Sequence, residues 1–211
     1  MVITKIVRSR KERGCFAVYV DDTLACLVSE EVLARFGLRG GGEIDEKSME
    51  QLSSAAATDR ARRIAINFLS YRPRSSREII DKLTREGIPA DVANNVAQHL
   101  RDIKMVNDLE FARMFVRDKL RGKPMGKAMM KQKLLVKGIA FQIIERVLKE
   151  YITEEDEQQA ATRLAEKKLK VSRGRFARLD TARQQKRLVD YLLHRGFSTE
   201  VAMKTVRNMI S

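Results

Sequence analysis

One pattern of residues occurs three times in this chain and limits the folds that it can adopt. Each copy has a leucine, a glycine four residues later and an apolar residue directly after the glycine. A glycine after helical residues can take the left-handed conformation that ends a helix, and the apolar residues that follow begin another amphipathic helix. Each copy therefore predicts two helices that fold back on each other. The copies are Leu83/Gly87/Ile88, Leu134/Gly138/Ile139 and Leu192/Gly196/Phe197.

The three glycines lie 51 and then 58 residues apart, a period that is typical of stacked structural repeats. Around the middle copy, the pattern predicts three helices, Asp108–Arg121, Gly126–Lys137 and Ala140–Tyr151. We therefore expect a mainly α protein with three tandem three-helix repeats in an elongated curved array. A small α+β module with a β-hairpin precedes the repeats. The expected domain limits are 1–57 for the module and 58–107, 108–153 and 154–211 for the repeats.

The first 57 residues have a different pattern. Runs of β-favouring residues predict three strands, and Asp21–Asp22 predicts the turn of a hairpin between the second and third. Ser29 is expected to cap a short helix, another is expected over Glu46–Ser54, and Ala55–Thr58 is expected to link the module to the repeats. The strands are predicted at residues 2–7, 15–20 and 23–28, with Phe16, Val18 and Val20 on the same face as Thr23, Ala25 and Leu27.

Charge is distributed unevenly along the chain. The formal net charge is +14, but residues 1–58 carry eight Lys/Arg against nine Asp/Glu, so the excess lies in the repeats. A basic surface confined to one part of a chain favours binding to a polyanion or to a partner that carries one. The alternative is a basic face that only keeps the protein soluble.

The candidate binding residues are the cations of the basic helices and joints. Residues 117–137 hold eight Lys/Arg and one acid, and residues 173–187 hold six and one. Arg113, Arg117 and Arg121 follow the i, i+4, i+8 spacing and so share one helix face. The full set is Arg72, Arg74, Arg77, Arg113, Arg117, Arg121, Lys123, Lys127, Lys131, Lys133, Lys137, Arg173, Arg175, Arg178, Arg183 and Arg187.

The chain lacks the sequence motifs of the common catalytic and cofactor sites. We find no P-loop, no H-E-x-x-H and no G-x-S-x-G, and His99 and His194 have no partners at ligand spacing. We expect no cofactor, no metal and no enzymatic activity. No apolar run approaches the roughly 18–20 residues of a membrane span, and no signal peptide is evident, so we expect a cytoplasmic protein that does not enter a membrane.

The middle repeat resembles the signature of the RecX family, bacterial regulators of the RecA recombinase. Parts of the other repeats resemble the family's first and third repeats, and the likeness extends over essentially the whole chain. One departure is Phe115, where many members have Tyr. The segments that carry the resemblance are Asp108–x–x–Phe111–Ala112–x–x–Phe115–Val116, Gly122–Lys123–Pro124–x–Gly126, Leu134–x–x–Lys137–Gly138–Ile139, Arg74–Ser75–Ser76–Arg77–Glu78 and Arg195–Gly196–Phe197–Ser198.

The resemblance implies a function without catalysis. Family members bind the RecA filament on single-stranded DNA along its helical groove and lower the ATPase, strand-exchange and co-protease activities of RecA. The chain is then expected to modulate recombination, DNA repair and the SOS response as a monomer, with direct contact to single-stranded DNA possible. Two rival classes stay open. A general basic DNA-binding module would bind naked DNA with a steep salt dependence, and a nuclease would show metal-dependent turnover.

Overall fold

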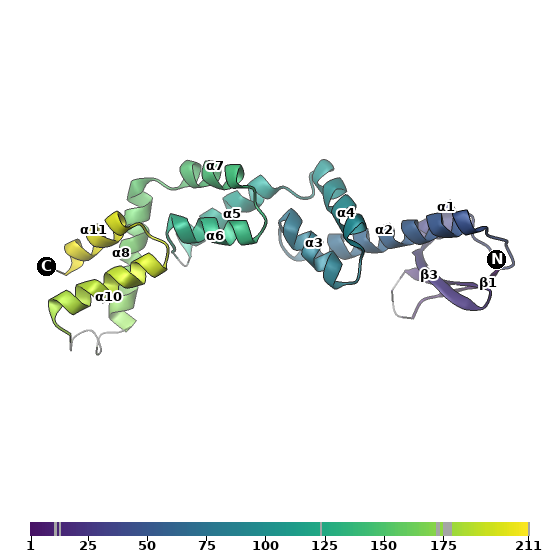
Figure 1. Ribbon diagram of the computed structural model, residues 1–211, viewed down its shortest axis with the longest axis horizontal. Coiled ribbons are helices and arrows are strands. Elements are labelled where there is room, and N and C mark those ends of the chain that lie inside the picture. Colours follow the sequence, from purple (N-terminus) through teal and green to yellow (C-terminus); the bar gives the residue numbers. More distant parts are fainter. Residues whose placement is uncertain (11, 13, 123, 172–173, 175–178, 211) are drawn as a thin grey trace. The chain divides into compact units, whose positions relative to one another are not determined.

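The computed structural model describes every residue except 11, 13, 123, 172–173, 175–178 and 211. It contains two compact units, Met1–Val106 and Asn107–Ser211, which we call the N-terminal and the C-terminal unit and describe separately. The chain is mainly helical, with one antiparallel sheet in the order β1-β2-β3 in the N-terminal unit (Figure 1). The predicted fold class is therefore confirmed. The predicted curvature of the array stays a prediction.

The sheet comes first in the chain and the helices follow it. Most observed ends lie within two residues of the predicted ones, and the helix predicted at Asp108–Arg121 has those limits. The elements are β1 Ile3–Arg8, β2 Cys15–Val20, β3 Thr23–Ser29, α1 Glu30–Arg35, α2 Glu46–Tyr71, α3 Ser76–Arg85, α4 Ala90–Asp102, α5 Asp108–Arg121, α6 Lys127–Val136, α7 Phe141–Tyr151, α8 Glu154–Val171, α10 Thr181–His194 and α11 Thr199–Met209.

The repeated leucine–glycine pattern forms the same turn each time. Gly87, Gly138 and Gly196 have φ values of 78°, 74° and 82°. The residue after each glycine donates its N–H to the carbonyl of the leucine, with N···O distances of 3.1, 3.1 and 3.2 Å. The three leucines are fully buried. This is the geometry of a Schellman motif, in which the turn satisfies carbonyls at the end of a helix.

Each repeat has its own hydrophobic core. In the first, Ala61 and Ala65 of α2 pack with residues of α3 and α4 around Leu83. In the second, Val116 of α5 packs with residues of α6 and α7 around Leu134. In the third, α8, α10 and α11 pack around Leu192. Three separate cores, each built from three helices, confirm that the chain contains three tandem three-helix repeats.

Helix α2 overturns one prediction. The linker expected at Ala55–Thr58 does not exist, because α2 runs without a break from Glu46 to Tyr71. Its first half buries Leu52 against the sheet, and its second half buries Ala65 in the first repeat. The reason lies in the composition of the segment, since alanine is the best helix former and neither glycine nor proline interrupts the run.

The hairpin is confirmed, but its register differs from the prediction. Asp21 and Asp22 have φ values of 46° and 63°, as a tight hairpin turn requires. Val20 pairs with Thr23 as expected, but Val18 pairs with Cys26 because the register shifts between Val18 and Tyr19. Such a β-bulge adds one residue to one strand, and beyond it Leu27 pairs with Ala17 and so lies on the face opposite to the predicted one.

In the C-terminal unit, the third repeat caps the helix α6 of the second. The first N–H groups of a helix have no partner within it. Here Gly126 and Ala128 donate to the carbonyls of Arg195 and Gly196, at 2.9 and 3.1 Å. The N–H of Lys127 donates to the carboxylate of Glu157 on α8, at 3.4 Å. The backbone of the second repeat is thus joined directly to the third.

Glu157 is buried at this junction and holds two groups at once. Its side chain is also 3.1 Å from the ammonium of Lys127. We expect Glu157→Ala to lower the free energy of unfolding of the C-terminal unit by about 1–3 kcal/mol, because it leaves a part-buried N–H without its acceptor. The matched control is Glu145→Ala, which removes an exposed ion pair with Lys131 and should cost under about 1 kcal/mol. Equal losses in urea unfolding would contradict a structural role for Glu157.

Candidate polyanion-binding surface

In the first repeat, each predicted cation already contacts another side chain of the protein. Arg72 lies 3.0 Å from the carboxylate of Glu78, and Arg77 lies 2.9 Å from that of Asp81. The guanidinium of Arg74 stacks on the ring of Phe68, with 3.7 Å between its central carbon and the ring centroid. Burial and the neighbouring charge of Arg72 lower the pKa of Arg74. Arg72 and Arg74 thus contact the helices on the two sides of the joint between α2 and α3, whereas the pair of Arg77 lies within α3.

Arg113 is also held inside its repeat. Its guanidinium donates hydrogen bonds to Glu110 at 2.6 Å and to Glu150 of α7 at 3.1 Å. These bonds raise the pKa of Arg113, with Glu110 the larger cause. Only 22% of its side chain is exposed, whereas Arg117 and Arg121 lie in exposed positions. Shared spacing therefore does not give these three arginines the same surroundings.

Three further predicted cations have carboxylate partners. Lys127 pairs with Glu157, Lys131 pairs with Glu145 at 2.7 Å, and Arg183 pairs with Asp180 at 3.3 Å. An approaching anion would compete with these carboxylates. Among the predicted residues, Lys123, Arg173, Arg175 and Arg178 lie outside the described part of the chain.

The remaining predicted cations differ from these. Among the residues that the structure describes, Arg117, Arg121, Lys133 and Arg187 have no carboxylate within ion-pair distance, and all four are exposed. Arg117 lies over the ring of Tyr151, and Lys137 lies over that of Phe111. Lys133 and Lys137 line one groove of about 490 Å³ on the second repeat, together with Lys119, Met125 and Met129. Arg117, Arg121, Lys133 and Arg187 therefore keep their charge available to a partner.

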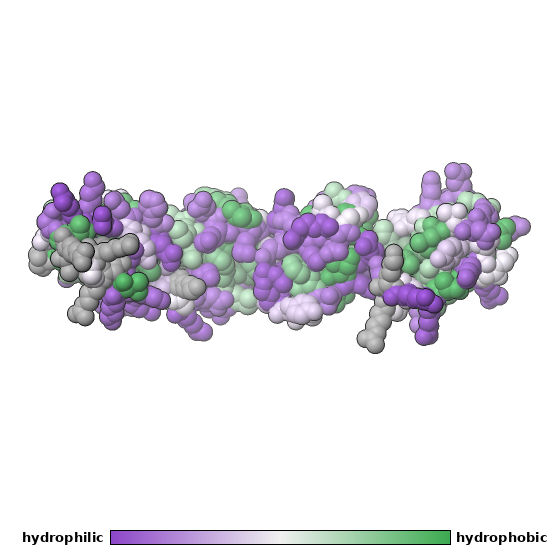
Figure 2. Space-filling model, turned by 90° about the horizontal axis from the view of Figure 1, so that it is seen from below, coloured by the Kyte–Doolittle hydropathy of each residue, from purple (hydrophilic) through white to green (hydrophobic). Residues whose placement is uncertain are grey.

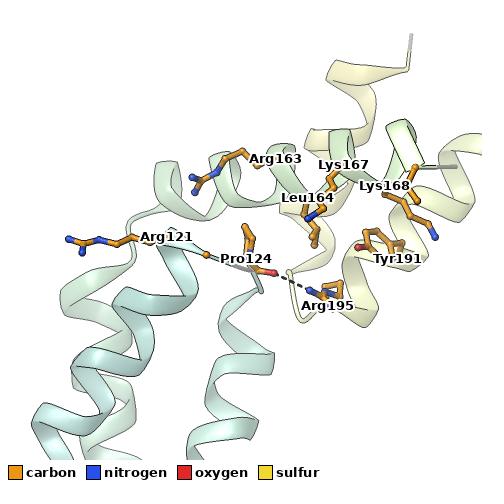
Figure 3. A pocket seen from close by; sticks show the side chains of 10 residues that line it. Arg121, Pro124, Arg163, Leu164, Lys167, Lys168, Tyr191 and Arg195 are labelled. Carbon is orange, nitrogen blue, oxygen red and sulfur yellow. Dashed lines mark hydrogen bonds between the residues drawn. The ribbon is translucent and has the colours of Figure 1, made fainter. Parts of the chain in front are cut away.

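A pocket of the C-terminal unit gathers cations that the sequence analysis missed. We call it the basic pocket, and it has a volume of about 470 Å³ (Figure 3). It lies where the end of α5 meets α8 and α10. Five cations are found among its described lining residues, and of these only Arg121 belongs to the predicted set. Its lining residues are Arg121, Gly122, Pro124, Arg163, Leu164, Lys167, Lys168, Val171, Tyr191 and Arg195.

Helix α8 supplies half of the basic pocket because of its periodicity. Arg163, Lys167 and Val171 follow each other at intervals of four, and Leu164 and Lys168 lie beside them on the same face. That spacing is visible in the sequence and could have indicated a basic face. The sequence could not have indicated the contribution of Arg195, because only the fold brings the end of α10 to the pocket. Its guanidinium donates to the carbonyl of Pro124 at 3.4 Å.

On the face shown in Figure 2, hydrophilic residues spread over both units, with hydrophobic residues in smaller areas between them. The described residues include no group of three or more His, Cys, Asp or Glu that could hold a metal ion. No helix within the described ranges is both long and apolar enough to cross a membrane.

Comparison with known proteins identifies the family. Sequence profiles of the first, second and third three-helix domains of RecX match residues 61–100, 107–148 and 154–206. A regulatory protein RecX of Listeria welshimeri is 32% identical over 96% of this chain and 73% of its own length. The chain belongs to the RecX family. RecX of Levilactobacillus brevis is likewise 32% identical, over 99% of this chain and 77% of its own length.

Solved RecX structures have the same fold. A crystal structure of a regulatory protein RecX aligns over 98% of both chains with a TM-score of 0.72 and 28% identity. RecX from Lactobacillus salivarius aligns over 74% of this chain and 97% of its own, with a TM-score of 0.64 and 27% identity. As a RecX protein, the chain is a regulator rather than an enzyme.

Proposed function

We propose that this RecX protein binds the RecA–single-stranded DNA filament in its helical groove and inhibits the ATPase, strand-exchange and co-protease activities of RecA. In this way it modulates recombination and DNA repair in the cytoplasm and contributes to control of the SOS response. The observation that carries the proposal is the similarity to regulatory RecX proteins over nearly the whole chain. The three repeats, which we assign to 58–107, 108–153 and 154–211, would follow the groove as one monomer.

The distribution of charge supports this proposal. A filament on DNA presents phosphates, and each phosphate that a Lys or Arg neutralises releases counterions. Exposed cations without carboxylate partners make such contacts without first breaking an ion pair. Arg117, Arg121 and Lys133 meet this condition on the second repeat, as does Arg187 on the third. We assign these four to the contact surface, and we give Arg72, Arg77 and Arg113 mainly structural roles.

The test is a titration of RecA ATPase on single-stranded DNA with this protein. We expect inhibition at protein concentrations well below those that cover the DNA, because the target is the assembled filament. A parallel titration of the same DNA without RecA measures when the DNA is covered. If inhibition begins only when the DNA itself is covered, the chain is a competing DNA-binding module, and the filament proposal fails.

A further inference from the structure

The basic pocket has a composition that suits a particular class of small ligand. We propose that it binds a nucleoside di- or triphosphate, with the phosphates among the lysine and arginine side chains and the base against Leu164 and Tyr191. This inference concerns a ligand other than the filament, and of the four residues assigned to the contact surface the pocket includes Arg121. It does not rest on the proposed function.

Charge is the first argument. Among the described residues, five cationic side chains and no carboxylate line the pocket. Within the described part of the chain, none of the five is paired with a carboxylate. Each phosphodiester of a nucleic-acid backbone carries one negative charge. A nucleoside di- or triphosphate brings several negative charges on adjacent phosphates, so it compensates this cluster better than one backbone phosphate does.

The shape and the apolar lining are the second argument. A volume of about 470 Å³ falls within the roughly 300–1,000 Å³ of small-molecule sites. Leu164 is almost completely buried and gives an apolar wall, and Tyr191 is a half-buried ring beside it, with the ammonium of Lys168 over the ring at 5.1 Å from its centroid. Bases bind to aromatic side chains by stacking. A bare inorganic anion would leave this part of the pocket unused.

Arg195 gives the third argument. It lies where α10 ends, and its one hydrogen bond to Pro124 is long at 3.4 Å. Its Nε is buried and has no hydrogen-bond partner among the described residues. Leaving such a donor unsatisfied is costly, and an anionic oxygen bound beside the guanidinium would remove that cost after a small rotation of the side chain.

The cationic side chains can also reach a bound ligand. Figure 3 shows Lys167 and Arg195 projecting into the space between α8 and α10, whereas Arg121 and Arg163 extend past its edge. Arg121, Arg163 and Lys167 are exposed, and exposed side chains change rotamer within nanoseconds. We therefore expect Lys167 and Arg195 to make the principal phosphate contacts and the other cations to close around them.

The experiment is a fluorescence anisotropy titration of the full chain with ATP that carries a methylanthraniloyl label. Unlabelled ATP and ADP should compete at least about tenfold better than AMP or inorganic triphosphate, because AMP carries fewer negative charges and triphosphate lacks the base. Lys167→Gln should weaken binding about tenfold or more, as loss of a hydrogen bond between charged groups does. The matched control is Lys170→Gln, which removes the same charge from the same helix outside the pocket lining and should change affinity less than about twofold.

Three results would overturn the proposal. The first is an equal loss of nucleotide affinity in Lys167→Gln and Lys170→Gln, which would mean that the overall positive charge of the helix attracts the nucleotide. The second is displacement of the label by short single-stranded DNA but not by ATP, which would make the pocket a backbone site. The third is competition by inorganic triphosphate as strong as that by ATP. RecA is absent from this experiment. A negative result would therefore contradict the nucleotide proposal and leave the filament proposal untouched.

Discussion

The Gly126→Ala variant is expected to lower the free energy of unfolding of the C-terminal unit by about 3 kcal/mol, at the upper end of what overpacking costs. A Cβ on Gly126 would lie 2.0 Å from the carbonyl oxygen of Gly196 and 2.2 Å from the nitrogen of Phe197. Both atoms belong to the backbone, so no side-chain rotation relieves the contact. The second and third repeats would have to separate at the place where Gly126 and Ala128 donate to the third repeat.

Gly196→Ala should cost at least as much because two effects combine. Gly196 has a φ of 82°, and its added Cβ would lie 2.3 Å from the backbone nitrogen of Met129. Gly87 provides the comparison, since it holds the same position in the first repeat with a φ of 78° and open space around it. Gly87→Ala should therefore show only the cost of the left-handed backbone, about 1–2 kcal/mol.

Urea unfolding and hydrogen exchange would measure these effects. The amides of Gly126 and Ala128 should be protected in the natural protein and should exchange much faster in either junction variant. Gly40→Ala is the neutral control, because its backbone is ordinary and nothing lies within 4 Å of the added carbon. If Gly126→Ala unfolds at the same urea concentration as Gly40→Ala, the close contact between the repeats does not exist in solution.

The features of the fold that the sequence predicts well depend on neighbouring residues. The leucine–glycine turns are set by residues within one helix and its end, and the sequence predicts all three. The linker predicted at Ala55–Thr58 is wrong, because two neighbouring cores can share one helix. Helix α2 contributes residues to both cores and continues without a break between them. The bulge in the hairpin escapes prediction for a related reason, because alternation along a strand does not reveal one extra residue.

The candidate site depends more on distant residues. The spacing of Arg113, Arg117 and Arg121 correctly places them along one helix, but Glu150, which binds Arg113, is 37 residues away in the sequence. Charge counting treats a paired and an unpaired arginine alike. In the sequence Arg195 is only part of a turn, yet the fold brings it to Arg163 and Lys167 in the basic pocket. Composition thus predicts that the repeats are basic, and only the fold shows which charges are available.

The double variant Arg117→Glu/Arg121→Glu should remain folded and should bind the RecA–DNA filament much more weakly. Both side chains are exposed and neither has a carboxylate partner among the described residues, so the change costs the fold little. Each phosphate that the variant no longer neutralises should reduce the slope of log affinity against log salt by about 1. With two arginines replaced, we expect the slope to fall by about 2.

Arg113→Glu is the matched comparison on the same helix, and it should have the opposite profile. The new carboxylate would face Glu110 and Glu150, where two hydrogen bonds now hold the guanidinium. We expect a clear loss of thermal stability, while the fraction that stays folded keeps the natural salt slope. Filament binding measured at several salt concentrations, together with thermal unfolding, separates the two variants. An unchanged affinity and slope in the folded double variant would remove Arg117 and Arg121 from the contact surface. A stable Arg113→Glu protein with weakened binding would mean that Arg113 contacts the partner after all.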